Sequence, residues 1–293
     1  MNEISFTIEH KYRVYPDSVI NTDNSVIYRA QDLQLQRDVC IKEIRVMGDT
    51  KKDLERNLNK ALSEARSMIK IAEKTEAIPN VYLHYYDSKT QKLYIVMDWI
   101  NGKTLDKLIE TEPGRVGEFE FLGWMEELCS ILLTMSGLKM YHKDIKPENI
   151  IIDNKKKLHL MDFNISVSLP NKIEGTPMYR APEMETSKTV TRDKVDVFSI
   201  GVILYQFYTG RIPKKGSEYA QKSIRRYNAD WDLFVQPKEI NEKIPDKINS
   251  LIVYCMQKDP NKRYDIGKVL HEIKAYRREM RMHGEKNRRR TKK

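Results

Sequence analysis

One set of short segments constrains this 293-residue chain more than anything else in its sequence. Residues 142–149 read HKDIKPEN, and Asp162-Phe163-Asn164 begins eighteen residues after Asp144. Other short segments keep a fixed order around them: VCIK at 39–42, GTPMYR at 175–180, APE at 181–183, DVFSIG at 196–201 and KRY at 262–264. Each segment alone is weak evidence, but chance agreement of the whole ordered set is negligible.

Hydrophobic periodicity along the chain indicates strands first and helices later. Strand-like runs occupy Val26–Ala30, Asp38–Ile44, Val81–Tyr86 and Leu93–Trp99, and one helical pattern, Lys51–Lys74, interrupts them. Helical patterns follow at Phe119–Leu138, Lys194–Tyr208, Ile248–Lys258 and Ile266–Met280. The pattern predicts an α+β protein with two lobes joined near Asp98–Gly102, an architecture that many protein families share.

The ordered segments resemble those of eukaryotic-type serine/threonine protein kinases, whose catalytic loop, metal-binding D-F-G and A-P-E follow one another in this order. The resemblance covers residues 10 to 275. It implies the bilobal protein-kinase fold, with a small β-rich N-lobe at 1–98, a larger and mostly helical C-lobe at 99–280, and a basic tail at 281–293. It also implies that Arg263 pairs with the glutamate of A-P-E.

The resemblance implies that the polar residues of the catalytic loop and of D-F-N act in phosphoryl transfer from ATP. Asp144 would act as the base that accepts or orients the proton of the substrate hydroxyl, and Lys146 would lie near the transferred phosphoryl group. Asn149, in the same catalytic set, and Asp162 would supply oxygen ligands for Mg²⁺, with Mn²⁺ as a possible substitute. Lys146 in this context favours protein serine/threonine kinases over tyrosine kinases.

The resemblance also implies a nucleotide site. Lys42 would hold the α- and β-phosphates and would be oriented by an ion pair with Glu64. The apolar pocket for adenine would have these walls: Val26 and Cys40 above, Ile151 below, Met97 at the back, and the backbone of Asp98–Ile100 along the polar edge.

The chain departs from the kinase pattern where a glycine-rich loop should cover the phosphates. Alignment of G-x-G-x-x-G-x-V on Val26 places Val19, Asn21 and Asn24 at the glycine positions, with Asp23 between them. Side chains there hinder a close approach of backbone to phosphate, and Asp23 adds a like charge. We therefore expect weak ATP binding. A pseudokinase that acts as a binding or scaffolding module is the alternative that this loop favours.

Two further departures concern activation. Asn164 replaces the glycine of D-F-G, and Lys143 replaces an arginine that would offer a planar fork to a phosphate. The activation segment carries Ser166, Ser168 and Thr176 as candidate hydroxyls, and we expect phosphorylation of the two serines to change the rate little. A small-molecule kinase of the aminoglycoside type is a third reading, but such enzymes lack the segment from Gly175 to Glu183.

Composition adds limits on location and partners. The cysteines Cys40, Cys129 and Cys255 are odd in number and far apart, so neither a disulfide framework nor a zinc site is indicated. The net charge is +10, of which residues 277–293 carry +7 from nine basic and two acidic side chains. With no secretory signal or apolar span, we expect a soluble cytoplasmic kinase of bacterial or phage origin. Its partner is a protein substrate, and the tail could contact nucleic acid, an anionic membrane surface or an acidic protein.

Overall fold

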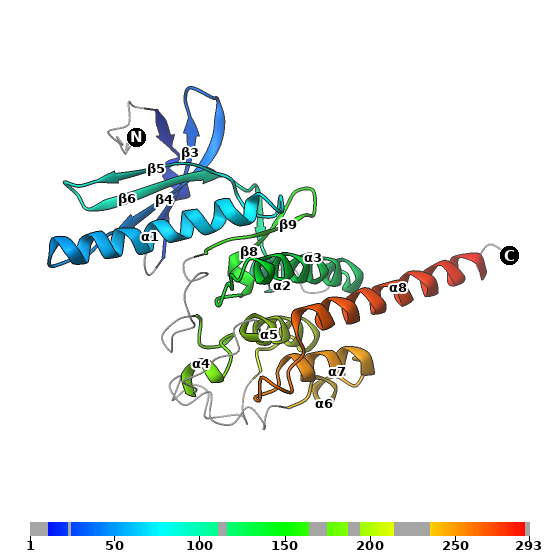
Figure 1. Cartoon of the computed structure of the whole chain (residues 1–293). Coiled ribbons are helices and arrows are strands. Elements are labelled where there is room, and N and C mark those ends of the chain that lie inside the picture. Colours follow the sequence, from blue (N-terminus) through cyan, green and yellow to red (C-terminus); the bar gives the residue numbers. More distant parts are fainter. Residues whose placement is uncertain are drawn as a thin grey trace. The chain divides into compact units, whose positions relative to one another are not determined.

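The computed structural model describes residues 11–22, 25–110, 116–163, 175–186, 194–213 and 235–290, with the side chains of 185–186 and 285–290 excepted. The chain divides into two compact units. The first contains Met1–Gly102, Asp153–Lys155 and His159–Asn164, and the second contains Lys103–Ile152, Lys156–Leu158 and Ile165–Lys293. The first unit is rich in strands and the second in helices (Figure 1), which confirms the predicted α+β class.

The first unit is built on an antiparallel sheet of six strands among the residues that are described. The strand order is β1-β3-β4-β6-β5, and β2 pairs with β3. The strands are β1 (Tyr12–Val14), β2 (Ile20–Asn21), β3 (Ser25–Asp32), β4 (Arg37–Arg45), β5 (Val81–Asp87) and β6 (Lys92–Asp98), and the short 3-10 helix η1 (Pro16–Ser18) follows β1. All four strand-like runs of the sequence are therefore strands.

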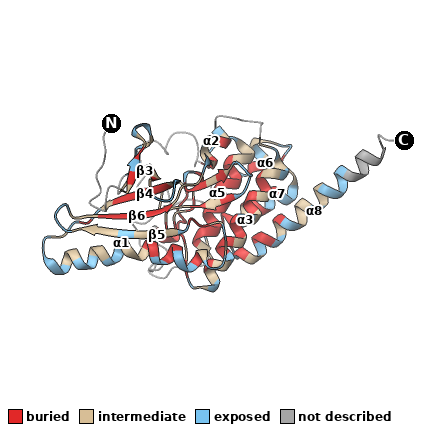
Figure 2. Ribbon diagram, turned by 90° about the horizontal axis from the view of Figure 1, so that it is seen from above, coloured by how far each residue is buried: buried red, intermediate tan, exposed pale blue. Residues whose placement is uncertain are grey.

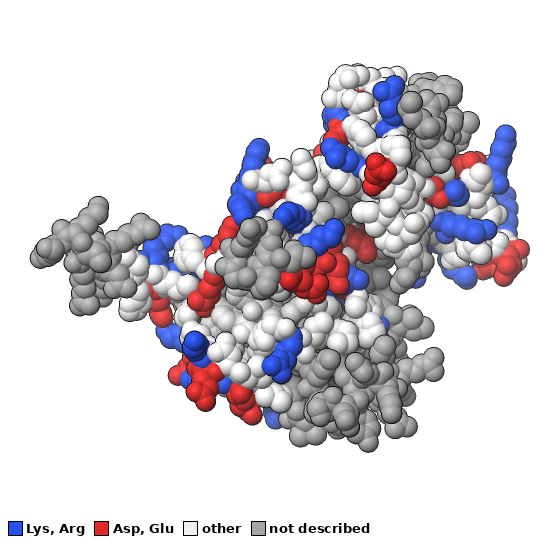
Figure 3. Space-filling model, turned by 180° about the vertical axis from the view of Figure 1, so that it is seen from behind, with Lys and Arg blue, Asp and Glu red and all other residues white. Residues whose placement is uncertain are grey.

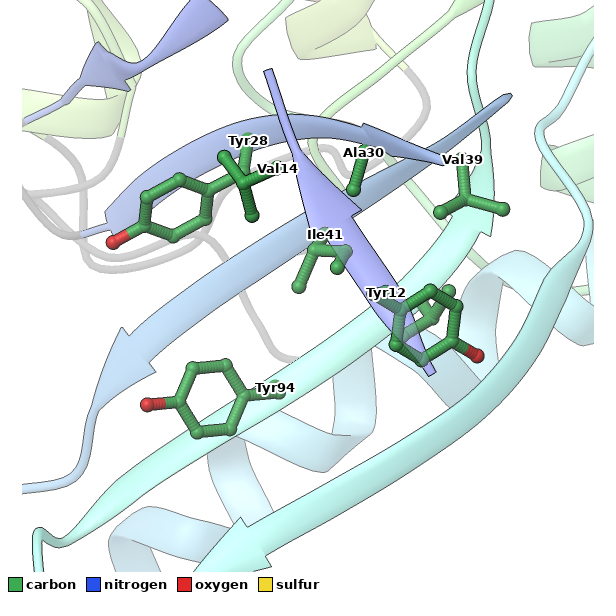
Figure 4. Close-up of a cluster of buried hydrophobic side chains, with 8 residues drawn as sticks. Tyr12, Val14, Tyr28, Ala30, Val39, Ile41 and Tyr94 are labelled. Carbon is green, nitrogen blue, oxygen red and sulfur yellow. The ribbon is translucent and has the colours of Figure 1, made fainter. Parts of the chain in front are cut away.

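A cluster of apolar side chains covers one face of this sheet (Figure 4). Alternate residues of β3 and β4 contribute to it, because side chains of a strand point to opposite faces in turn. Its buried members are Tyr12, Val14, Tyr28, Ala30, Val39, Ile41, Tyr94 and Val96. The intervening residues of β4, Cys40 and Lys42, consequently belong to the other face.

Helix α1 (Lys51–Ala72) is the main helix of the first unit. It begins at Thr50, whose hydroxyl accepts a hydrogen bond from the Asp53 backbone N–H at 3.1 Å and so satisfies an otherwise unpaired donor. Its buried face contains Glu64, Ala65, Ser67, Met68 and Ile71. A carboxylate among apolar residues needs a partner, and the site described below contains it.

The second unit consists mainly of helices, and α5 is buried over most of its length (Figure 2). The helices are α2 (Leu105–Glu110), α3 (Glu118–Gly137), α4 (Glu183–Thr186), α5 (Val195–Thr209), α6 (Pro237–Ile240), α7 (Asp246–Cys255) and α8 (Ile266–Arg290), with the 3-10 helix η2 (Pro147–Asn149). A separate sheet has the order β7-β8-β9 and consists of β7 (Gly102–Thr104), β8 (Ile150–Asp153) and β9 (Leu158–Leu160).

Close packing of α5 against α7 depends on Gly201. A Cβ at this position would lie 2.7 Å from the Cβ of Cys255 and 2.6 Å from a side-chain carbon of Met256. Any larger residue would therefore push the two helices apart. Burial raises the pKa of the Cys255 thiol to about 12, and this cysteine acts as an apolar packing residue.

Helix α8 corrects the expectation for the C-terminus. The sequence predicted a helical pattern over Ile266–Met280 with a basic tail at 281–293, but α8 continues past Gly284 to Arg290. One glycine inside a helix costs only about 1 kcal/mol relative to alanine, and strong helix formers surround this one. Earlier in α8, Arg277 pairs with Glu126 of α3 at 2.5 Å and stacks on Phe119, which fixes the helix to its unit.

Charge and hydropathy add two observations. Lys and Arg are interspersed with Asp and Glu over the face displayed in Figure 3, in keeping with a net charge that lies mostly in residues 277–293. Among the described residues, no helix combines the length and the apolar character that a membrane crossing requires.

Candidate active site

The first unit contains a buried ionic group centred on Lys42. The Lys42 ammonium donates to Glu64 Oε1 at 2.7 Å and to Asp162 Oδ1 at 2.9 Å. Strand β4 supplies the lysine, α1 supplies the glutamate, and Asp162 follows β9. Lys42 is 5% exposed and Glu64 is 2% exposed, whereas the side chain of Asp162 is 36% exposed. The predicted ion pair of Lys42 with Glu64 is therefore present, and Asp162 joins it.

Electrostatics keep this lysine charged despite its burial. Burial alone would lower the pKa of Lys42, but the carboxylates of Glu64 and Asp162 outweigh that effect and raise the pKa above the ordinary value. A fixed ammonium next to a partly exposed carboxylate can bind phosphate oxygens. The group therefore offers one positive and one negative centre close together, a composition suited to binding a charged ligand.

Backbone geometry at Asp162 is unusual for a residue with a side chain. Its φ is +64°, in the left-handed region that non-glycine residues enter rarely and at a cost. Phe163, next along the chain, is 1% exposed and anchors the segment in the interior. Asn164, Ser166 and Ser168, three of the residues singled out in the sequence, lie outside the described part of the chain.

Strand register corrects one member of the predicted adenine pocket. Val26 pairs with Glu43, whereas Ile27 pairs with Lys42. Residues that pair directly point to the same face of the sheet, and Val26 packs against the apolar cluster on the opposite face. The placement of Val26 beside Cys40 and Lys42 is therefore wrong, and Ile27 occupies that face instead. Residues 27 and 42 differ by an odd number, so the register of the hairpin, and not a count in steps of two along the chain, places Ile27 on this face.

The same correction shifts the alignment of the glycine-rich loop pattern by one residue. With G-x-G-x-x-G-x-V aligned on Ile27, the glycine positions fall on Ile20, Thr22 and Ser25. Ile20 pairs with Ile27 in a regular β2–β3 ladder, and the Thr22 hydroxyl donates to the Ser25 carbonyl at 2.9 Å. The loop still has no glycine. Asp23 and Asn24 lie outside the described residues.

The other predicted pocket residues are distributed over both units. Cys40 pairs directly with Met97 between β4 and β6, so the two share the face of Lys42. Burial raises the pKa of the Cys40 thiol to about 12, which makes it an unreactive apolar group. Asp98 ends β6 and Ile100 follows it in the first unit, whereas Ile151 lies on β8 in the second unit.

The second unit contains a polar group centred on Asp144. The Thr176 backbone N–H and hydroxyl donate to Asp144 Oδ1 at 2.7 and 2.8 Å. The Lys146 ammonium donates to the Thr176 hydroxyl at 2.9 Å and lies 3.5 Å from Asp144 Oδ2. The Asn149 amide nitrogen donates to the Asp144 carbonyl at 2.9 Å. The structure thus brings Asp144, Lys146, Asn149 and Thr176 together.

The loop that carries Asp144 is fixed by a buried aspartate of α5. Asp196 accepts the backbone N–H groups of His142 and Lys143 at 2.9 and 2.6 Å. Burial raises the pKa of Asp196, while His142 and the two N–H groups oppose the rise. Lys143 has a φ of +67°, so this loop holds a residue in the left-handed region directly before Asp144. Sequence reasoning noted Asp196 as part of a motif but missed this anchoring role.

The segment that carries Thr176 is fixed at both ends. At one end Gly175 has a φ of +81°, and a Cβ there would lie 2.6 Å from the Lys143 carbonyl oxygen. At the other end Glu183 forms a bidentate pair with Arg263 at 2.6 and 2.8 Å, as the sequence predicted. The side chain of Arg263 is 0% exposed. These contacts determine where the Thr176 hydroxyl lies.

Each of the two predicted magnesium ligands, considered in its own unit, has the oxygen donor type that Mg²⁺ prefers. Asn149 uses its amide nitrogen toward Asp144, which leaves an oxygen of the type Mg²⁺ binds. Asp162 offers a partly exposed carboxylate. Among the described residues, no group of three or more His, Cys, Asp or Glu side chains could hold a metal. Mg²⁺ usually needs no cage of protein ligands alone when a nucleotide supplies oxygens.

Comparison with known proteins gives one consistent result. Residues 22–273 match the family model described as "Protein kinase domain". A probable serine/threonine-protein kinase of Clostridium acetobutylicum is 27% identical over 278 residues, which is 92% of this chain and 40% of that protein. The serine/threonine-protein kinase PrkC of Bacillus subtilis is 28% identical over 82% of this chain and 36% of its own length.

A third relative, the serine/threonine-protein kinase PknB of Mycolicibacterium smegmatis, is 26% identical over 82% of this chain and 39% of its own length. The chain therefore spans about two fifths of the length of these curated relatives. The part that the family model matches, residues 22–273, includes both polar groups described above.

Proposed function

Because the chain belongs to the protein kinase domain family, in its eukaryotic-type serine/threonine branch, we propose that it transfers the γ-phosphoryl group of ATP to a serine or threonine hydroxyl of a protein, with Mg²⁺ as cofactor. The observation that carries the proposal is the Asp144 group. Its carboxylate, the Lys146 ammonium and the Thr176 hydroxyl form one connected network with distances of 2.7–2.9 Å.

Asp144 is the proposed base. Thr176 donates to one carboxylate oxygen, Oδ1, through both its N–H and its hydroxyl. Among the described residues, Oδ2 has longer contacts, with Asn149 at 3.3 Å and Lys146 at 3.5 Å. Oδ2 is therefore the oxygen better able to accept or orient a substrate hydroxyl proton. Phosphoryl transfer depends mainly on such positioning, since its transition state is loose.

Lys146 and Lys42 are the proposed cations for the phosphates. Lys146 is held by Thr176 at 2.9 Å and would compensate charge that develops on the transferred group. Lys42, held by Glu64 at 2.7 Å, would bind the α- and β-phosphates. Asn149 and Asp162 would hold Mg²⁺, which neutralises phosphate charge when it is bound.

Ile27, Cys40 and Met97 would contact the adenine ring, together with Ile151 and the backbone of Asp98–Ile100. Strand register supports the first three, because they share the sheet face of Lys42. Weak ATP binding is expected, since Ile20, Thr22 and Ser25 stand where glycines would let the backbone approach phosphate.

A pseudokinase that binds partners without transferring phosphate remains the second candidate, because of the same three residues. The two candidates differ in a direct experiment: incubation with ATP labelled in its γ-phosphoryl group, Mg²⁺ and a generic basic protein. Phosphoserine or phosphothreonine in the protein supports the kinase. Nucleotide binding by calorimetry without any transfer would favour the scaffold.

The basic C-terminal segment is proposed to hold the kinase near a polyanion. Residues 277–293 carry +7, and such contacts would be driven by charge and would weaken steeply with salt. Deletion of 285–293 should leave activity on a short peptide unchanged and should reduce retention on heparin at low salt. Loss of peptide kinase activity would instead assign the segment to the fold.

A further inference from the structure

The segment Asp98–Ile100 begins at the last residue of β6. The side chains of Asp98 and Trp99 are held by separate sets of residues. The proposed function uses the backbone of this segment for the polar edge of adenine. Its side chains have no role there. Each of them nevertheless makes contacts that restrict how the backbone can move, and all the partners belong to the first unit.

The Asp98 carboxylate is the acceptor for three donors that lie close together in sequence. Asn80 donates to Asp98 Oδ2 through its backbone N–H and its side-chain amide, both at 2.8 Å. The Tyr82 hydroxyl donates to Asp98 Oδ1. In return the Asp98 backbone N–H donates to the Asn80 carbonyl at 3.0 Å. Arg37 stacks on the Tyr82 ring, 3.6 Å from its centroid, which limits the motion of that ring.

The Trp99 ring is held by a cation instead of a hydrogen bond. The Arg29 guanidinium lies 5.3 Å from the Trp99 ring centroid and 5.0 Å from that of Tyr15. Asp38 fixes the guanidinium by accepting from its Nε at 3.1 Å, and it also accepts from the Tyr15 hydroxyl at 3.0 Å. Within the described residues, the buried Trp99 Nε1 has no hydrogen-bond partner, so stacking determines where this ring lies.

We propose that Asn80, Tyr82 and Arg29, acting through Asp98 and Trp99, are positioning residues that set the backbone of Asp98–Ile100 for recognition of the adenine base. We call these five residues the segment clamp. The inference rests on the proposed function, because it assumes that ATP binds there. It goes further by assigning base selectivity to side chains that do not touch the nucleotide.

A fixed backbone matters for two physical reasons. A segment that is ordered before binding loses less conformational freedom when the nucleotide arrives, and that saving adds to affinity. Hydrogen bonds to a purine edge also discriminate only when donor and acceptor are held in place, since a mobile segment can adapt to another base. Because this chain has no glycine in its phosphate loop, the contacts of the base should account for a larger share of the binding.

The test compares MgATP with MgGTP in variants that leave residues 98–100 unchanged. The double variant Asn80→Ala/Tyr82→Phe removes two of the three donors to Asp98. We expect its KM and Kd for MgATP to rise roughly threefold to tenfold, less than the full effect of a lost hydrogen bond to a charged group, because these bonds act on affinity only by ordering the segment. Its constants for MgGTP should change little, and kcat should stay similar. The preference for ATP over GTP should therefore shrink.

The matched control lies at the other end of the same hairpin. Asp87 accepts from the Lys89 N–H at 2.9 Å and from the Thr90 hydroxyl at 2.7 Å, so Asp87→Asn also removes charged hydrogen bonds from β5. This variant should leave the ratio of the KM values for MgATP and MgGTP unchanged. If the double variant melts at a much lower temperature than the unaltered chain, the single variant Tyr82→Phe, at an exposed position, replaces it in the comparison.

A variant of Arg29 provides an independent test of the segment clamp. Arg29→Lys keeps the charge toward Asp38 but loses the planar stacking surface, and it should raise the KM for MgATP in the same selective way. The segment clamp is overturned if the variants keep the ATP to GTP ratio of the unaltered chain, or if Asp87→Asn changes it equally. Absence of any nucleotide binding by the unaltered chain in calorimetry would overturn the proposed function as well, so the two failures are distinct.

Discussion

The ammonium of Lys42 lies 2.7 Å from Glu64 Oε1, and both side chains are almost entirely buried. This pair joins a strand to a helix within the first unit, and neither charge has much water to solvate it. Because an isolated buried charge is costly, the pair couples the stability of the unit to the geometry of its phosphate-binding lysine.

Lys42→Met should lower stability by about 3–5 kcal/mol, because it leaves the Glu64 carboxylate buried without its cation. The further change Glu64→Gln should restore most of that stability but none of the kinase activity. Urea unfolding of Lys42→Met, of Glu64→Gln and of the double variant gives the coupling free energy of the pair as a double-mutant cycle. Equal losses in the single and double variants would contradict a coupled pair.

The stability of Lys42→Met should also depend on pH. Burial raises the pKa of Glu64, and Lys42 opposes that rise, so the variant has a folded-state pKa further above the unfolded value. The folded state then binds more protons than the unfolded state, and stability falls as pH rises through this interval. Urea midpoints should therefore increase as pH is lowered from 7 toward 5. A urea midpoint that does not change with pH would indicate that Glu64 is solvated in the variant.

Gly175→Ala should strongly reduce kcat. The residue has a φ of +81° and its new Cβ would lie 2.6 Å from the Lys143 carbonyl, so the segment that carries Thr176 must shift. Gly210→Ala is the matched control, with a φ of +69° but no atom within 4 Å of the new Cβ. It should cost about 1–2 kcal/mol of stability and leave kcat similar. Equal kcat values in both variants would refute the positional argument.

Arg263→Ala should destabilise the second unit by about 3–5 kcal/mol, because Glu183 would lose a bidentate partner whose side chain is 0% exposed. The comparison variant is Lys247→Ala, which breaks an exposed pair with Glu279. Such surface pairs contribute about 0–1 kcal/mol. Thermal melting of the two variants measures the contrast, and similar melting temperatures would count against the anchoring role of Arg263.

Thr176→Ala should lower kcat by about tenfold or more, since its hydroxyl links Lys146 to Asp144 and hydrogen bonds to charged groups contribute about 1.5–3 kcal/mol. Thr176→Ser keeps the hydroxyl and should retain most activity. Initial rates at saturating ATP give the comparison. Activation by Thr176→Glu would instead indicate a regulatory phosphorylation site at this residue.

Much of the fold and the ionic site could be predicted from the sequence, because regular patterns report them directly. The helix predicted at Lys51–Lys74 occurs as Lys51–Ala72, since its apolar residues keep a strict helical spacing. The pairs of Lys42 with Glu64 and of Glu183 with Arg263 followed from the kinase-like motifs. The helix followed from one local pattern, whereas the two pairs followed from the ordered set of motifs.

Other features depended on pairing between distant segments and escaped sequence reasoning. Val26 was assigned to the nucleotide face because a loop without glycines offers no fixed point for the alignment, and an error of one residue moves a strand side chain to the opposite face. The contacts of Asn80 and Tyr82 with Asp98 depend on how β5 meets β6, including the register shift between Val81 and Leu83. Neither strand alone contains that information.

Phosphoryl transfer by the Asp144→Asn variant tests the central claim most directly. The rate at saturating MgATP should fall about a hundredfold or more, in line with loss of a general base, while the melting temperature stays near that of the unaltered chain. Asp153→Asn, which alters a carboxylate paired with His159 at 3.2 Å, should keep its activity. An Asp144→Asn variant that retains more than about a tenth of the rate would contradict the assignment of Asp144 as the base.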